Sequence, residues 1–203
     1  YDKGKTPDKA FQLLADTGWD ANFPGLKEVN TEQLHQQLQN VTALAGTSRL
    51  PKQQVGLMVS AIVASKLSDN DARTFLKHTT VGDDMKNQAY NLSRLQPPTV
   101  LNGPAIKTWV KDLPRGVTAA QYDTLRTLLG ERCEVGETAA QFGVLHAPEP
   151  DLLKGSDVLA TRPDERPGPW VKQLLDAARA AQYEEKFTTH DGAVRWLQDT
   201  IRV

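Results

Sequence analysis

The sequence predicts an all-α fold, and three observations favour it. Apolar residues recur at helical spacing in most segments of the chain. Residues that cap helices precede these segments, and glycine or proline follows them. No segment shows the alternation of a half-buried strand, and no repeat of fixed period is found. With 203 residues, of which 39% are hydrophobic and 24% charged, the chain is long enough for a substantial apolar core.

The helices of the first half are punctuated clearly. Thr6 and Pro7 predict the first helix start, and Gly18 its end. Asn30 predicts a second helix that ends at Gly46. After Pro51, residues 55–63 are apolar nearly all round, which predicts a central buried helix. Ser68 with Asp71 resembles a capping box, and a further apolar stripe covers 85–95.

The second half continues the helical pattern. Asn102 and Pro104 predict a short helix to Leu113. Thr118 with Gln121 forms a capping-box pattern before a helix that ends at Gly130. A helix is expected at about 134–145. Two clear helices follow at 169–182 and 189–200.

A change in composition predicts the domain boundary. Residues 147–169 hold five prolines around one short turn. We therefore expect a multi-helix body at 1–146 and a small helical tail subdomain at 147–203, with Gly-Ser-Asp and Pro-Gly-Pro turns.

Charge and hydropathy exclude several classes of protein. The formal net charge is -1, so no overall positive field attracts nucleic acid or an anionic membrane, and an RNA-binding face would be local. No stretch approaches a membrane span or the apolar core of a signal peptide. A single cysteine, Cys133, excludes an internal disulfide and a cysteine zinc cage and suits a reducing cytoplasm. We expect a cytoplasmic protein without a membrane partner.

No self-sufficient catalytic centre can be identified. The four histidines are scattered without metal-binding spacing, and the His190-Asp191 dipeptide is interpreted as part of a helix start. Nucleotidyl transfer requires a Gly-Ser loop and paired carboxylates that hold Mg²⁺. Asp69 and Asp71 have the carboxylate spacing without the loop, and Gly155 to Asp157 lacks the second aspartate. We expect no catalytic residue, metal site or cofactor in these residues.

The tail carries the candidate binding residues. Gly168 and Pro169 form a tight helix start, where backbone N–H groups and the helix dipole could accept a phosphate. Trp170 follows, able to stack on a base or to pack. The basic residues around this start are Lys154, Arg162, Arg166, Lys172 and Arg179. Residues 152–203 contain eight Lys or Arg and eight Asp or Glu, so a helix corner with solvated charges is the alternative interpretation.

Two ordered matches extend over most of the chain. The tail match comprises Leu152 to Leu159 (LLKGSDVL), Pro167 to Pro169, Ala181 to Tyr183, Thr188, Ala193, Trp196 and Leu197. The front match comprises Ala10 to Leu14 (AFQLL), Gly18, Trp19 and Phe23 to Leu26. Together they resemble the helical body and tail of bacterial class II CCA-adding tRNA nucleotidyltransferases and their poly(A) polymerase relatives.

The resemblance implies a role rather than an activity. The family's catalytic head, with its Gly-Ser and Asp-x-Asp motifs and its Mg²⁺, is not represented, Gly25 replaces the usual glutamate, and the HD-like body is degenerate. The family's body and tail hold the acceptor and TΨC region of tRNA. We therefore expect a non-catalytic domain that binds tRNA or a similar structured RNA. It is either a part of a longer enzyme, with the catalytic head covalently linked, or a headless relative that works with a separate head. The alternatives are a headless protein-interaction module of phage or accessory-gene origin and, with little support, a metal-dependent phosphohydrolase.

Overall fold

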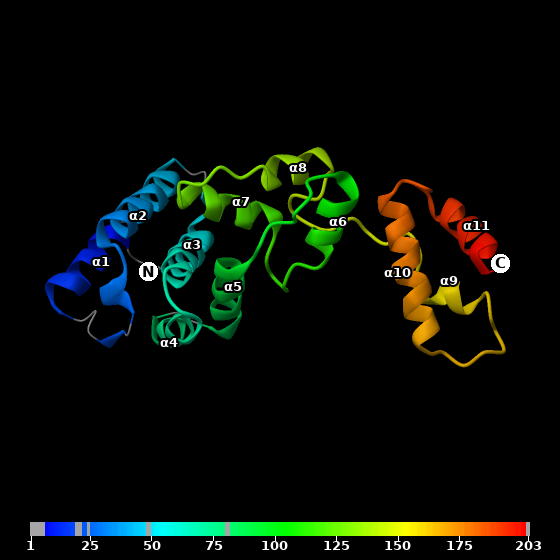
Figure 1. Ribbon diagram of the computed structural model, residues 1–203, viewed down its shortest axis with the longest axis horizontal. Coiled ribbons are helices and arrows are strands. Elements are labelled where there is room, and N and C mark those ends of the chain that lie inside the picture. The colour runs from blue at the N-terminus through cyan, green and yellow to red at the C-terminus, as the bar shows by residue number, and fades with distance from the viewer. Residues whose placement is uncertain (1–6, 19–21, 24, 48–49, 80–81, 202–203) are drawn as a thin grey trace. The chain divides into compact units, whose positions relative to one another are not determined.

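The computed structural model describes residues 7–18, 22–23, 25–47, 50–79 and 82–201, and within these ranges it contains helices and no strand (Figure 1). The all-α prediction is therefore confirmed. The first helices are α1 (Pro7–Asp16), the 3₁₀ turn η2 (Leu26–Glu28), α2 (Thr31–Gly46), α3 (Lys52–Ser65), α4 (Asp69–Thr79) and α5 (Asp83–Arg94). They are followed by α6 (Gly103–Lys111), α7 (Ala119–Leu128), α8 (Val135–Gln141), α9 (Gly155–Leu159), α10 (Pro169–Tyr183) and α11 (His190–Ile201).

Most helix starts form as their caps predict. Asn30 accepts a hydrogen bond from the backbone N–H of Gln33, and Asn102 accepts one from Ala105. Thr118 and Gln121 form a reciprocal capping box at the start of α7. The expected cap Thr6 lies outside the described residues. The helix expected at 134–145 is shorter, because Gly143 takes a left-handed conformation beyond Gln141.

The chain divides into two compact units. The N-terminal unit comprises Tyr1–Pro97 and Leu113–Gly136, and the C-terminal unit comprises Pro98–Asp112 and Glu137–Val203. This division differs from the boundary expected at residue 147, because α6 and α8 residues from Glu137 onward group with the last three helices. None of the helices in the described part of the chain is long and apolar enough to cross a membrane.

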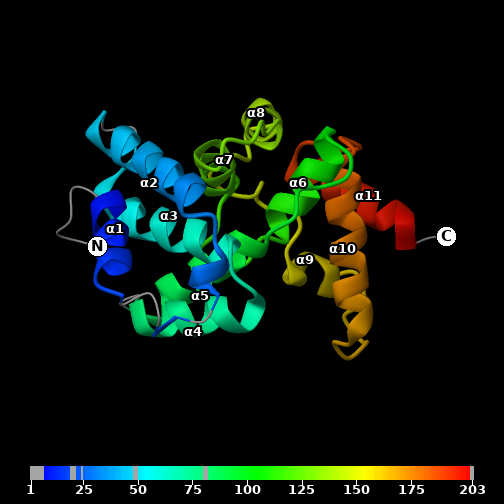
Figure 2. The ribbon, with the colours of Figure 1, turned by 60° about the vertical axis from the view of Figure 1, so that its left-hand side comes forward.

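Helix α3 is the centre of the N-terminal unit. Met58, Val59, Ile62 and Val63 are fully buried, which confirms the central helix expected from its apolar sequence. Neighbouring helices α2, α4, α5 and α7 pack against it, and both views show α3 between α2 and α5 (Figures 1 and 2).

The C-terminal unit has its own apolar cluster. Its buried members are Leu153, Val158, Ala178, Ala181, Phe187, Ala193 and Leu197. These residues join α9, α10 and α11, and α6 packs on α10 as well. Gln182 of α10 also holds the segment before α9, since its side chain accepts from the N–H of Leu152 and donates to the carbonyl of Pro150. All candidate binding residues predicted from the sequence, from Lys154 to Arg179, lie within the bounds of this unit.

Candidate nucleic-acid interface

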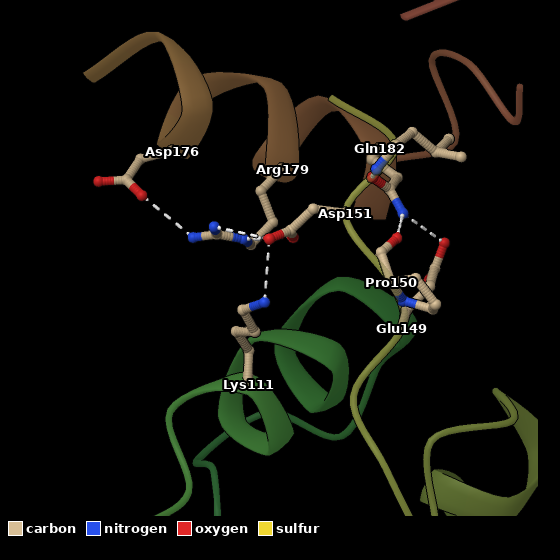
Figure 3. A network of polar contacts seen from close by, with 8 residues as sticks. Lys111, Glu149, Pro150, Asp151, Asp176, Arg179 and Gln182 are labelled. Carbon is tan, nitrogen blue, oxygen red and sulfur yellow. Dashed lines mark hydrogen bonds and ion pairs between the residues drawn. The ribbon is translucent and has the colours of Figure 1, made fainter. Parts of the chain in front are cut away.

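Arg179 is held by two carboxylates of the same unit. Its Nε donates to Asp151 Oδ1 at 2.8 Å and its Nη2 to Asp151 Oδ2 at 3.1 Å, while its Nη1 donates to Asp176 Oδ1 at 3.0 Å. Lys111 Nζ lies 3.0 Å from the same Asp151 Oδ2. Lys111, Asp151, Asp176 and Arg179 form what we call the Asp151 network (Figure 3). Arg179 is therefore largely neutralised within the protein.

Local sequence explains part of this network. Asp176 and Arg179 are three residues apart on α10, so their side chains meet on one face. Asp151 follows Pro150, whose carbonyl is bound by Gln182. The hydrogen bonds from Arg179 are the largest cause that lowers the pKa of Asp151, and the bond to Asp151 is the largest that raises the pKa of Arg179. Both groups are therefore charged at neutral pH.

Arg162 and Trp170 build the corner before α10. Arg162 Nη1 donates to Glu165 Oε2 at 3.0 Å, and its guanidinium carbon lies 5.2 Å from the centroid of the Trp170 ring. Trp170 Nε1 donates to the carbonyl of Arg166 at 3.2 Å, and the ring packs against the apolar cluster. The contacts of Trp170 are thus mainly those of a packing residue.

The start of α10 has the expected geometry. Gly168 is the N-cap in an extended conformation and Pro169 is the first helical residue. No side chain caps this end, and no acidic residue lies in the first turn. The positive end of the helix dipole is consequently not offset by a carboxylate of its own helix.

Three candidate cations remain available. Lys154, Arg166 and Lys172 are exposed, and no ion pair joins them to a carboxylate in the described ranges. Lys154 and Arg179 line one surface pocket, and Lys172 and Arg179 line another. Lys154 and Lys172 therefore lie at two separate pockets that share Arg179. Arg162, Arg166, Gly168 and Trp170 gather at the helix corner.

Sequence reasoning missed Lys111 and Tyr183. Tyr183 is 3% exposed, and burial is the main cause that raises its pKa to about 12. It lies on the face of α10 that also carries Lys172, Asp176 and Arg179, because these four residues are spaced at i, i+4, i+7 and i+11. That spacing is visible in the sequence and could have placed Tyr183 beside the two candidate cations of this helix. Lys111 could not be found this way, since it reaches the network from α6.

The alternative catalytic sites are not assembled. Asp71 accepts from the hydroxyl of Ser68, and Asp69 pairs with Arg94, so both act at the start of α4. His190 begins α11 after Thr189, whose hydroxyl accepts from the N–H of Gly192. Among the residues that the structure describes, no group of three His, Cys, Asp or Glu could hold a metal ion. Burial raises the pKa of the Cys133 thiol, which disfavours the reactive thiolate.

No model of a known protein family, no curated protein and no solved structure matches the chain. The resemblance to CCA-adding enzymes therefore stays a prediction from the sequence.

Proposed function

We propose that the C-terminal unit binds structured RNA, of the kind formed by a tRNA acceptor region, and positions it for a nucleotidyltransferase head supplied separately or by a longer chain. The observation that carries this proposal is the set of exposed cations Lys154, Arg166 and Lys172, which have no carboxylate partner among the described residues. Arg166 and Lys172 flank the start of α10, whose first turn contains no acidic residue. The ordered motif matches of the tail support the choice of RNA.

The proposed mode of binding is recognition of shape and phosphates. Double-helical RNA offers phosphates and 2′-hydroxyls rather than readable base edges, so a few cations at the right spacing are sufficient. Three phosphate contacts predict that the logarithm of the association constant falls with the logarithm of salt concentration with a slope of roughly -2 to -3. Such a modest salt dependence of RNA binding is expected for a protein whose net charge is near zero and whose cations lie on one local face.

Charge reversal tests the proposal. In the double variant Arg166→Glu/Lys172→Glu, two attractive phosphate contacts become repulsive, so we expect binding to a tRNA acceptor-stem hairpin to be abolished in fluorescence polarisation. The matched control is Lys77→Glu/Arg195→Glu, which changes the net charge equally at two exposed helical positions on α4 and α11. Binding that survives in the first variant, or is lost equally in both, would contradict the proposed face.

One observation favours a second candidate function, a protein-interaction module. Arg162 and Arg179 are already paired with Glu165, Asp151 and Asp176, which leaves the face closer to neutral than the sequence count of cations implies. A protein partner bound through this face would show little dependence on salt. The salt slope of RNA binding therefore separates the two functions.

A further inference from the structure

The corner before α10 comprises residues 160–168 and connects this helix to α9 (Figure 1). Prolines at positions 163, 167 and 169 fix the φ angle in the corner and at its end. Arg166 and Gly168 each precede a proline, which confines them to extended conformations. Gly168 adopts such a conformation, with φ of -155° and ψ of -171°. The unfolded corner therefore has few conformations to lose when it becomes ordered.

Trp170, the second residue of α10, contacts the corner at three places. Its Nε1 donates to the carbonyl of Arg166 at 3.2 Å, and the guanidinium carbon of Arg162 lies 5.2 Å from the ring centroid. A Cβ atom added at Gly168 would lie 3.3 Å from Trp170 Cδ1, so the ring lies against the backbone there. The same ring packs on the apolar cluster of the C-terminal unit. One side chain thus connects the corner to that cluster.

The corner contains two arginines whose situations differ. The N–H of Glu165 donates to the carbonyl of Arg162 at 3.1 Å, and the Arg162 side chain donates to the Glu165 carboxylate at 3.0 Å. Arg162 is therefore paired within its own turn. Arg166 is exposed and has no carboxylate partner in the described ranges, while its backbone carbonyl is bonded by the Trp170 indole. The available cation of the corner is the one that Trp170 holds.

We propose that Trp170 is a positioning residue, whose indole N–H fixes the Arg166 backbone and so places the Arg166 side chain for contact with an RNA phosphate. A cation on an ordered loop loses less conformational freedom on binding than one on a loop that must first become ordered. Trp170 thereby raises the affinity without a contact of its own to RNA. The identity of the ligand rests on the proposed function, whereas the ordering of the corner can be measured without RNA.

The first experiment measures the ordering in the full chain. Trp170→Phe keeps an aromatic ring for the apolar cluster and removes the N–H donor. In ¹⁵N relaxation measurements we expect the amide order parameters of residues 164–166 and 168 to fall from about 0.85, typical of a rigid backbone, toward about 0.6. The matched control is Trp196→Phe, which removes the same atoms from another tryptophan that packs on this cluster. It should leave the order parameters of the corner unchanged.

The second experiment is a double-mutant cycle on binding of the tRNA acceptor-stem hairpin. Trp170→Phe and Arg166→Gln should each weaken binding about three- to tenfold, the scale of ordering one flexible side chain. Because Trp170 acts through Arg166, adding Trp170→Phe to Arg166→Gln should weaken binding no further. Lys172→Gln provides the matched background, since Lys172 is an exposed cation of α10 for which no bond to Trp170 is found among the described residues. There the two losses should add.

Order parameters that stay unchanged in Trp170→Phe, or losses that add fully in the Arg166→Gln background, would overturn the inference. An equal loss of hairpin affinity in Trp196→Phe would also overturn it, because packing on the cluster would then explain the effect. If the corner loosens in Trp170→Phe while the hairpin does not bind the wild type, the proposed function fails and the ordering by Trp170 stands. If the hairpin binds and the losses add, the proposed function stands and the positioning role fails.

Discussion

Position 103, the first residue of α6, requires glycine because of a close contact that the neighbouring sequence does not reveal. A Cβ atom added at this position would lie 2.8 Å from the ring of Phe142, closer than packed atoms tolerate. Gly103→Ala should therefore displace the ring or the helix and lower the free energy of unfolding by about 1–3 kcal/mol. Urea denaturation measures this change.

Gly155 provides the matched control for that substitution. It is also the first residue of its helix, α9, but a Cβ atom there meets nothing within 4 Å. Gly155→Ala should leave stability unchanged or raise it slightly, since alanine restricts the unfolded chain. Equal effects at the two positions would show that the contact with Phe142 is not what requires glycine.

Residues that act on their near neighbours in sequence were predictable. Asn30, Asn102 and Thr118 cap their helices through groups three residues ahead, so the pattern alone contains the interaction. Arg179 differs, because its principal partner Asp151 lies 28 positions away. The sequence identified Arg179 as a cation near a helix start but could not show that a carboxylate occupies it.

At the scale of elements, the Asp151 network links α10 to α6, and it predicts that the free energy of unfolding depends on pH. Hydrogen bonds from Arg179 hold the pKa of Asp151 below its ordinary value of about 4. A carboxylate with a lowered folded pKa stabilises the protein above its unfolded pKa, and that contribution disappears as pH falls through the folded value. We expect the wild type to lose stability on acidification below about pH 4 partly through this residue.

Asp151→Asn tests that dependence. The variant should be less stable than the wild type by about 1 kcal/mol at pH 7, the scale of a partly exposed ion pair, and the difference should shrink as pH falls from about 4 toward 2. Denaturant titrations at several pH values measure it. Asp199→Asn removes a carboxylate from an exposed position of α11 and should show neither effect. A difference for Asp151→Asn that is constant with pH would contradict the assigned role.

At the scale of the whole molecule, the sequence predicted helices better than their grouping. Helix starts and apolar faces are local patterns, and they located the central helix α3 and the final helices α10 and α11. The boundary expected at residue 147 relied on proline content. It did not anticipate that α6 packs on α10 and that Lys107 and Lys111 of α6 pair with Glu149 and Asp151. Such pairings join distant segments, so composition cannot reveal them.

The two compact units predict two sets of cooperatively unfolding residues. Leu197 is fully buried in the apolar cluster of the C-terminal unit, and truncation to alanine should cost about 2–5 kcal/mol there. If α6 unfolds with that cluster, native-state hydrogen exchange of Leu197→Ala should accelerate at amides of α6, α9, α10 and α11 together. Amides of α3 should be unaffected. Ile62→Ala, at a fully buried position of α3, should give the opposite pattern. If the amides of α6 lose protection in Ile62→Ala and keep it in Leu197→Ala, this helix unfolds with the N-terminal body, as the boundary at residue 147 predicts.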